Sequence, residues 1–222
     1  MPDVSGALRF YARATDYVAA AGLDREVSWQ RNSELASVSE STLLREAAWV
    51  VLCSGFRESI VRRVFDHVSL CFCDWDSATA IVESYPACHL AARASFRNTA
   101  KLSAIVEIAR RIEAVGFDAL KRSIVVDPIT TLRQFPYIGP VTVWHLAKNL
   151  GLDAAKPDRH LVRISKRFGF GGPDQFCAAI ADASGEAVKV IDLVVWRYLA
   201  DNADRDHGAQ EVFSILASRS SS

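Results

Sequence analysis

One carboxylate stands where a helix is expected to begin, about twenty residues after a tight turn. The turn is the run Phe-Pro-Tyr-Ile-Gly-Pro at residues 135–140, in which the two prolines lack amide donors and Gly139 is free to adopt a positive φ. Apolar residues then recur at helical spacing up to Gly151, and Asp158 precedes a second helical segment. A hairpin between helices exposes backbone amides, which can bind an anion such as a phosphate. A hairpin followed by a carboxylate at this spacing therefore favours a nucleic-acid partner.

The composition is that of a folded chain with a sizeable core. The chain has 222 residues, half of them apolar, and 26 basic residues balance 26 acidic ones. A net charge near zero leaves room for a local basic face, so it neither indicates nor excludes nucleic-acid binding. Five cysteines without a CxxC pattern predict free thiols in a reducing cytoplasm rather than a zinc site or a cubane iron–sulfur cluster. We see no signal-peptide pattern and no apolar run of membrane-spanning length.

Helical periodicity runs along almost the whole chain and predicts an all-α protein of about ten helices. Clear amphipathic segments lie at residues 43–51 and 186–200, and a last one is expected at 210–217. Between an opening helix expected at residues 5–22 and the helix at 43–51, the sequence reads as a polar connector that contains the run WQRN at residues 29–32. Strand-like alternation is nearly absent, and only residues 123–126 hint at it.

The hairpin closely resembles the helix-hairpin-helix of the base-excision DNA glycosylase superfamily. That family has roughly the pattern apolar-Pro-Gly-apolar-Gly-x-x-Thr, followed about twenty residues later by Asp-x-His-apolar-x-Arg, and residues 135–142 and 158–163 supply the two halves. The run FRNTAK at residues 96–101 also resembles the family's aromatic-Arg-Asn-Lys-Ala segment before a bundle helix. The resemblance extends from about residue 40 to about residue 200, and the hairpin with its spaced Asp is more specific than the hairpin alone.

The resemblance implies one glycosylase domain over residues 1–222, with a two-lobed all-α fold and a cleft between the lobes. One lobe would be a central helical bundle over about residues 35–150 that carries the hairpin 135–140. The other lobe would combine about residues 1–30 with residues 151–222. It also implies a monomer that acts on double-stranded DNA in the cytoplasm, associated with the nucleoid, without a membrane.

In the resembled family the hairpin holds the DNA backbone, and that role transfers here by position. The glycine lets amides approach a phosphate, and the next helix adds its positive N-terminal end. Such contacts do not depend on sequence, and the target base must still be extruded into a pocket. Backbone carbonyls of Arg133, Phe135 and Ile138 would hold a monovalent cation, K⁺ or Na⁺, and no other cofactor is required. The implied DNA-binding residues are Tyr137, Ile138, Gly139, Pro140, Val141, Thr142, Arg163 and Lys101.

Two positions depart from the family pattern. The first hairpin glycine is Tyr137 here, so this position must keep a negative φ or hold a strained left-handed tyrosine, and its ring is free to line the groove or stack on a nucleotide. Family members that also cleave the strand carry a nucleophilic Lys at Val141, which valine cannot replace. Lys148 lies about 10 Å further along the same helix, and Lys156 is the nearer alternative. We therefore expect base removal by water, which leaves an abasic site.

Asp158 would carry that chemistry. Cleavage of an N-glycosidic bond passes through an oxocarbenium-like sugar, and a carboxylate stabilises this charge and orients or deprotonates water. An Asp before a helix is also an ordinary N-cap, and both roles are compatible because a cap orients the carboxylate. Basic residues follow it, and they fit either a phosphate-facing or a solvated helix face: Arg159, Arg163, Lys166 and Arg167.

The base pocket is the least defined part of the site. Large aromatic and amide side chains are the natural groups to stack on or to hydrogen-bond an extruded base. The candidates are Trp29 and Gln30 in the polar connector, Phe56 at a helix junction, and Trp144, for which its apolar helix favours core packing. Alkylated purines and deaminated or modified pyrimidines, including modified phage bases, stay open as substrates. The resembled oxidised-guanine enzymes generally use the missing Lys.

Three hypotheses follow from these patterns. The leading one is a monofunctional DNA glycosylase that hydrolyses the N-glycosidic bond of a damaged or modified base extruded from duplex DNA. Its enzymatic variant is a bifunctional glycosylase and lyase that uses a displaced Lys. The second is a non-catalytic helix-hairpin-helix DNA-binding protein, and the third is a plain helical interaction domain without salt-dependent DNA affinity.

Overall fold

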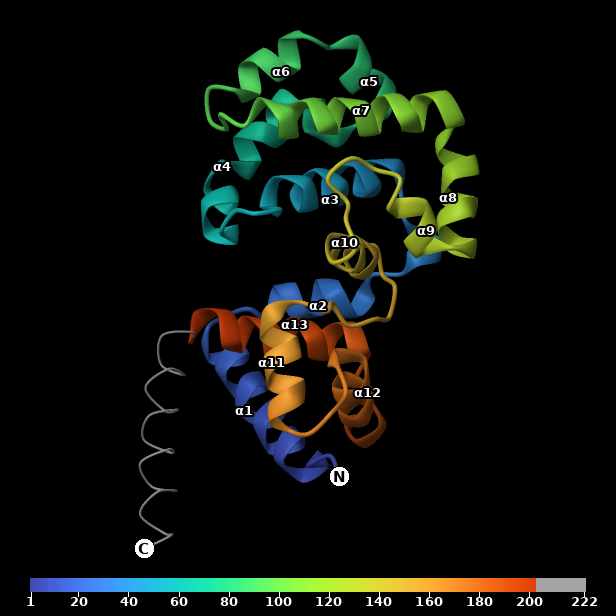
Figure 1. Cartoon of the computed structure of the whole chain (residues 1–222). Coiled ribbons are helices and arrows are strands. Elements are labelled where there is room, and N and C mark those ends of the chain that lie inside the picture. The colour runs from blue at the N-terminus through green and yellow to red at the C-terminus, as the bar shows by residue number, and fades with distance from the viewer. Residues whose placement is uncertain (203–222) are drawn as a thin grey trace, which may run out of the picture. The chain divides into compact units, whose positions relative to one another are not determined.

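The computed structural model describes residues 1–202, and every regular element within them is a helix (Figure 1). The all-α prediction is therefore confirmed for the described part of the chain. These residues contain thirteen α-helices and two 3-10 helices. This is more than the ten or so helices that the sequence predicted, because the polar connector and a short segment at Ala87–Ala92 are also helical. Residues 123–126 belong to a helix as well, so the hint of a strand was wrong, and the helix expected at 210–217 lies outside the described residues.

The chain divides into two compact units, which are described separately. One unit is Asn32–Lys156, and the other joins Met1–Arg31 to the chain from Pro157 onward. The sequence-based boundaries were about residues 35–150 for the first and about 1–30 with 151–222 for the second. The hairpin thus lies in one unit, and Asp158 lies just inside the other.

The Asn32–Lys156 unit is built around α3 (Glu40–Cys53), which is buried along most of its length. Ser39 starts this helix, because its hydroxyl accepts the Thr42 amide hydrogen at 3.1 Å. Helices α4, α7 and α10 pack on α3, and a cluster of apolar side chains between residues 38 and 150 fills the space between them. The remaining helices of the unit are η1 (Leu35–Ser37), α4 (Glu58–Cys71), η2 (Cys73–Trp75), α5 (Ala78–Glu83), α6 (Ala87–Ala92), α7 (Thr99–Val115), α8 (Phe117–Val126), α9 (Pro128–Leu132) and α10 (Thr142–Asn149).

The other unit is a small helical cluster in which α1 packs along α13. Their shared core is made by Ala14 and Val18 of α1 and by Val190 and Val194 of α13. Helices α11 and α12 cover α13 in turn. The described helices of this unit are α1 (Val4–Ala20), α2 (Asp24–Asn32), α11 (Arg159–Arg167), α12 (Pro173–Ser184) and α13 (Val188–Asp201).

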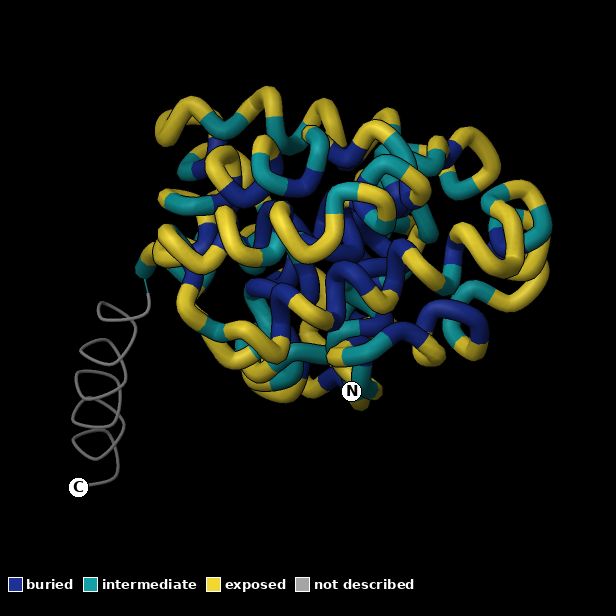
Figure 2. Tube along the Cα trace, turned by 90° about the horizontal axis from the view of Figure 1, so that it is seen from above, coloured by how far each residue is buried: buried dark blue, intermediate teal, exposed yellow. Residues whose placement is uncertain are grey.

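Burial follows helical periodicity throughout the described residues. Buried and exposed stretches alternate along much of the chain (Figure 2), as amphipathic helices around a core require. Within residues 1–202, each helix falls short of the length and apolarity that a bilayer span requires.

Candidate functional site

The hairpin between α9 and α10 is closed by one hydroxyl. The Thr142 hydroxyl oxygen accepts the Gly139 amide hydrogen at 2.7 Å and lies 3.2 Å from the Tyr137 carbonyl oxygen, to which it donates. Two apolar residues, Phe135 and Ile138, point into the core and anchor the loop. The sequence placed Thr142 among the DNA-binding residues, and the structure gives it an internal role in shaping the loop.

Tyr137, and not Gly139, takes the left-handed backbone conformation of the hairpin. Tyr137 has φ 63°, while Gly139 stays outside the positive-φ region. Of the two conformations that the sequence left open for Tyr137, the structure has the left-handed one. A non-glycine residue in this region carries a conformational cost, so something else must favour it here. The Tyr137 side chain is 44% exposed, so its ring lies at the protein surface.

The N-terminal end of α10 is well suited to bind an anion. Its N-cap is Val141, whose side chain has no acceptor atom for the first amide groups of the helix. The Val143 amide donates to the Gly139 carbonyl at 3.0 Å, and the positive end of the helix dipole lies beside the loop. Gly139 contributes open space, because an added Cβ would meet only the Thr142 hydroxyl, at 3.9 Å. This part of the hairpin can therefore approach a phosphate closely.

Lys101 is not on the surface, contrary to the expectation that it contacts DNA directly. It lies in the first turn of α7 and is only 3% exposed. Its ammonium donates to the Val51, Leu52 and Ser54 carbonyls and to the Ser54 hydroxyl, so it closes the C-terminal end of α3. The sequence contained the signal, because Lys101 continues the buried stripe formed by Ile105, Ile108 and Ile112. Sequence reasoning missed Ser54 as its partner.

Asp158 is the N-cap of α11. Its Oδ1 accepts the amide hydrogens of His160 and Leu161 at 2.9 and 3.0 Å. These two bonds fix the orientation of the carboxylate, as the capping hypothesis required. The residue is partly buried, and the structure leaves its catalytic role as a prediction.

The helix that Asp158 begins has one apolar and one basic side. Leu161, Ile164 and Ser165 are buried, and the side chains of the other face reach solvent. The exposed basic residues of α11 are Arg159, Arg163, Lys166 and Arg167. A single helix face with four cations is suited to contact phosphates, and the predicted role of Arg163 is compatible with its exposure.

The two lysines considered for strand cleavage differ in their exposure. Val141 itself is 43% exposed at the start of α10. Lys148, in the last turn of the same helix, is buried and only 5% exposed. Lys156 is partly exposed at the end of the Asn32–Lys156 unit.

The proposed pocket residues lie in three different environments. Trp29 and Gln30 belong to helix α2, not to a polar connector, and Trp29 is 40% exposed while Gln30 is fully buried. Phe56 follows α3, is also 40% exposed, and packs against Phe96 with ring centroids 5.4 Å apart. Trp144 is partly buried against the core cluster, which favours the packing interpretation.

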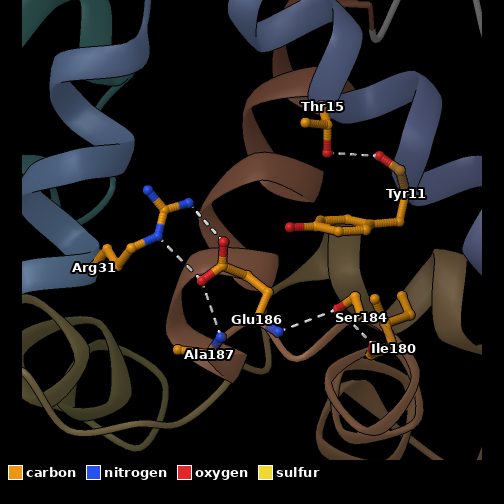
Figure 3. A network of polar contacts seen from close by, with 7 residues as sticks. All are labelled: Tyr11, Thr15, Arg31, Ile180, Ser184, Glu186 and Ala187. Carbon is orange, nitrogen blue, oxygen red and sulfur yellow. Dashed lines mark hydrogen bonds and ion pairs between the residues drawn. The ribbon is translucent and has the colours of Figure 1, made fainter.

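Two ion pairs explain why α2 is a helix despite its polar sequence. Arg31 binds Glu186, with its Nη2 2.6 Å from the carboxylate, and Arg197 binds Glu26 at 2.5 Å. Figure 3 shows the Arg31–Glu186 pair at the start of α13, beside Tyr11. The Arg31 guanidinium lowers the pKa of Glu186, and burial, with the Glu186 charge, raises the pKa of Tyr11. The partners are more than a hundred and fifty residues from α2, where local sequence patterns cannot reveal them.

Comparison with known proteins adds one finding. The structure is similar to the crystal structure of the 8-oxoguanine DNA glycosylase of Thermotoga maritima, with a TM-score of 0.60 and 19% sequence identity, over 87% of this chain and 95% of that chain. The chain has a helical glycosylase fold. At this identity the similarity extends to the fold alone. No family model matches the sequence, and no curated protein sequence matches it.

Proposed function

We propose that the chain is a DNA N-glycosylase that removes a damaged or modified base from duplex DNA by hydrolysis. The observation that carries this proposal is the pairing of two motifs in one helical glycosylase fold. One is the hairpin with an open α10 N-terminus, and the other is a carboxylate oriented at the N-terminus of α11. Neither motif is specific by itself, whereas their combination matches what base excision requires.

The hairpin binds the DNA backbone in this proposal. The N-terminal end of α10 donates amide hydrogens to a phosphate, and the exposed Arg163 neutralises another. Three backbone carbonyls, of Arg133, Phe135 and Ile138, hold K⁺ or Na⁺. Neutral carbonyl oxygens suit such ions, and the Phe135 carbonyl keeps a second lone pair beside its bond from the Ile138 amide.

Asp158 acts on the extruded nucleotide. As the bond between the sugar carbon and the base nitrogen lengthens, positive charge develops on the sugar, and the carboxylate stabilises it. Asp158 also orients a water molecule, whose oxygen bonds to the sugar carbon while the base leaves with the electron pair of the broken bond. The water gives one proton to the Asp158 carboxylate, and the departing base nitrogen takes up one proton, so the carboxylate is regenerated when it releases its proton. The products are the free base and an intact strand with an abasic site.

The absence of a lysine at Val141 supports hydrolysis without strand cleavage. A Schiff base with the sugar requires an amine at the reacting carbon, and Val141 has none. Burial of Lys148 removes one alternative amine. Lys156 remains the residue to test for the alternative, a bifunctional glycosylase and lyase.

The experiment is a base-release assay on a panel of labelled duplexes. The panel contains 8-oxoguanine, which the similar Thermotoga maritima enzyme is named for, together with alkylated purines, uracil and modified pyrimidines. Each product is analysed before and after alkali, because an abasic site breaks only after alkali. Strand breaks before alkali, together with a borohydride-trapped complex, would favour the lyase. Tight binding to abasic-site DNA without base release on any duplex would favour the non-catalytic DNA-binding protein.

A further inference from the structure

The buried ammonium of Lys101 connects two segments that are distant in the sequence. It reaches from α7 to the C-terminal end of α3, where the Ser54 carbonyl and hydroxyl lie at 2.6 and 2.9 Å from Nζ. Besides these atoms and the Val51 and Leu52 carbonyls, it contacts two aromatic rings. The nitrogen lies 5.3 Å from the ring centroid of Phe56 and 5.1 Å from that of Tyr137.

These two rings are among the exposed aromatic residues of the Asn32–Lys156 unit. Phe56 is 40% exposed and Tyr137 is 44% exposed, although each contacts a cation that is itself buried. Phe56 is also supported by the ring of Phe96 behind it. One nitrogen contacts both rings, so Phe56 and Tyr137 both lie beside the same ammonium, and they are called here the aromatic pair.

The contact with Lys101 also accounts for the backbone of Tyr137. The left-handed conformation of this residue disfavours a tyrosine over the glycine that the resembled hairpins have there. A cation beneath the ring favours this conformation, because attraction between a desolvated ammonium and a π face is strong. The hairpin thus keeps a bulky side chain at a position where glycine would be easier.

We propose that Lys101 is a positioning residue for DNA binding, which holds Phe56 and Tyr137 together so that their exposed faces stack on nucleobases left unpaired around the extruded nucleotide. This inference rests on the proposed function. Stacking of a base on an aromatic ring is tolerant of sequence, as a search for damage requires. The hairpin amides beside Tyr137 hold the phosphate at the same time.

A purely structural role for Lys101 makes a different prediction. If Lys101 only donates hydrogen bonds to the C-terminal end of α3, its loss weakens DNA binding equally whether or not Tyr137 is present. If it acts through Tyr137, the effect of its loss depends on that ring. The two roles are therefore separated by a double-mutant cycle.

The experiment compares the full chain with Lys101→Met, Tyr137→Gly and the double variant, and Lys101→Arg tests whether charge alone restores function. The probe is a duplex with a tetrahydrofuran abasic-site analogue, and an undamaged duplex is the control. We expect Lys101→Met to weaken binding to the analogue about tenfold when Tyr137 is present and less than twofold in the Tyr137→Gly background. Equal losses in both backgrounds, or no loss in either, would overturn the inference.

A second measurement does not depend on DNA. In protein with ¹³C-labelled tyrosine, the Tyr137 ring resonance is assigned by its loss in Tyr137→Phe. We expect this resonance to shift in Lys101→Met while the circular dichroism of the variant stays that of a folded helical protein. An unshifted resonance would overturn the inference. A wild-type chain that binds no DNA would overturn the proposed function, and the resonance would still report whether Lys101 holds Tyr137.

Discussion

The hydroxyl oxygen of Thr142 lies 2.7 Å from the Gly139 amide nitrogen and accepts its hydrogen across the hairpin. This bond joins the first residue of α10 to the loop before it. The loop contains two prolines, so it has few amide donors of its own with which to hold its shape. The Thr142 hydroxyl therefore helps to hold the conformation of the hairpin, together with the buried side chains of Phe135 and Ile138.

Replacement of Thr142 by Val tests this role. The two side chains have the same shape, so the change removes the hydroxyl and leaves the packing. We expect a loss of about 1 kcal/mol in the free energy of unfolding and about a fivefold loss of affinity for duplex DNA. Chemical denaturation and a fluorescence-anisotropy titration measure these quantities. Thr142→Ser, which keeps the hydroxyl, is the control and should behave as the wild type in both.

Asp158→Asn separates the cap from the chemistry. Asparagine caps a helix about as well as aspartate, because its side-chain oxygen accepts the same amide hydrogens, so stability should change little. The negative charge is lost, and base release should fall by at least about a hundredfold. Thermal unfolding and single-turnover base release measure the two effects. Asp158→Ala should lose stability as well, and full activity of Asp158→Asn would exclude a catalytic role for the carboxylate.

Much of the fold could be predicted from the sequence because local signals agree with the tertiary structure. The N-caps Ser39 and Asp158 stand where the apolar periodicity of α3 and α11 begins, and Gly116 ends α7. In these places the cap, the amphipathic pattern and the core all select the same helix. Helix α2 is the exception, because it has little apolar periodicity. Its ion pairs are made with Arg197 of α13 and with Glu186, which lies just before α13.

The hairpin was only partly predictable for a related reason. The motif located the loop, and the left-handed Tyr137 contacts Lys101, which comes from another helix. The resemblance implied a DNA contact for Lys101, whereas the structure buries its side chain on the apolar stripe of α7. A charged side chain on such a stripe indicates a buried partner, here the end of α3.

Lys101 should also give the stability a specific pH dependence. Burial lowers the pKa of Lys101 to about 8, below its usual value of 10.5. Between these two values the unfolded chain holds more protons at this position than the folded chain, so the free energy of unfolding should rise with pH. The neighbouring titratable groups are the Tyr137 phenol and the Cys53 thiol, and burial raises the pKa of Cys53 to about 12. The thiol therefore stays neutral in this range.

The measurement is chemical denaturation between pH 7 and pH 10, compared with Lys101→Met. Below pH 8 the wild type carries the cost of a buried ammonium, which its oxygen partners offset. Above pH 8 the deprotonated amine removes that cost, and the stability difference between wild type and variant should widen in favour of the wild type. Parallel curves across this range would show that Lys101 titrates normally.

Val141→Lys tests whether the hairpin accepts the missing nucleophile. Val141 is exposed at the N-cap of α10, so a lysine there meets no steric obstacle, and its amine stands beside the phosphate-binding amides. We expect the variant to form a borohydride-trapped complex with abasic-site DNA and to cleave the strand before alkali, because the amine can attack the ring-opened sugar. The wild type should do neither. Val141→Gln, of similar length without a nucleophilic amine, is the matched control, and trapping by that variant would assign the reaction to another residue such as Lys156.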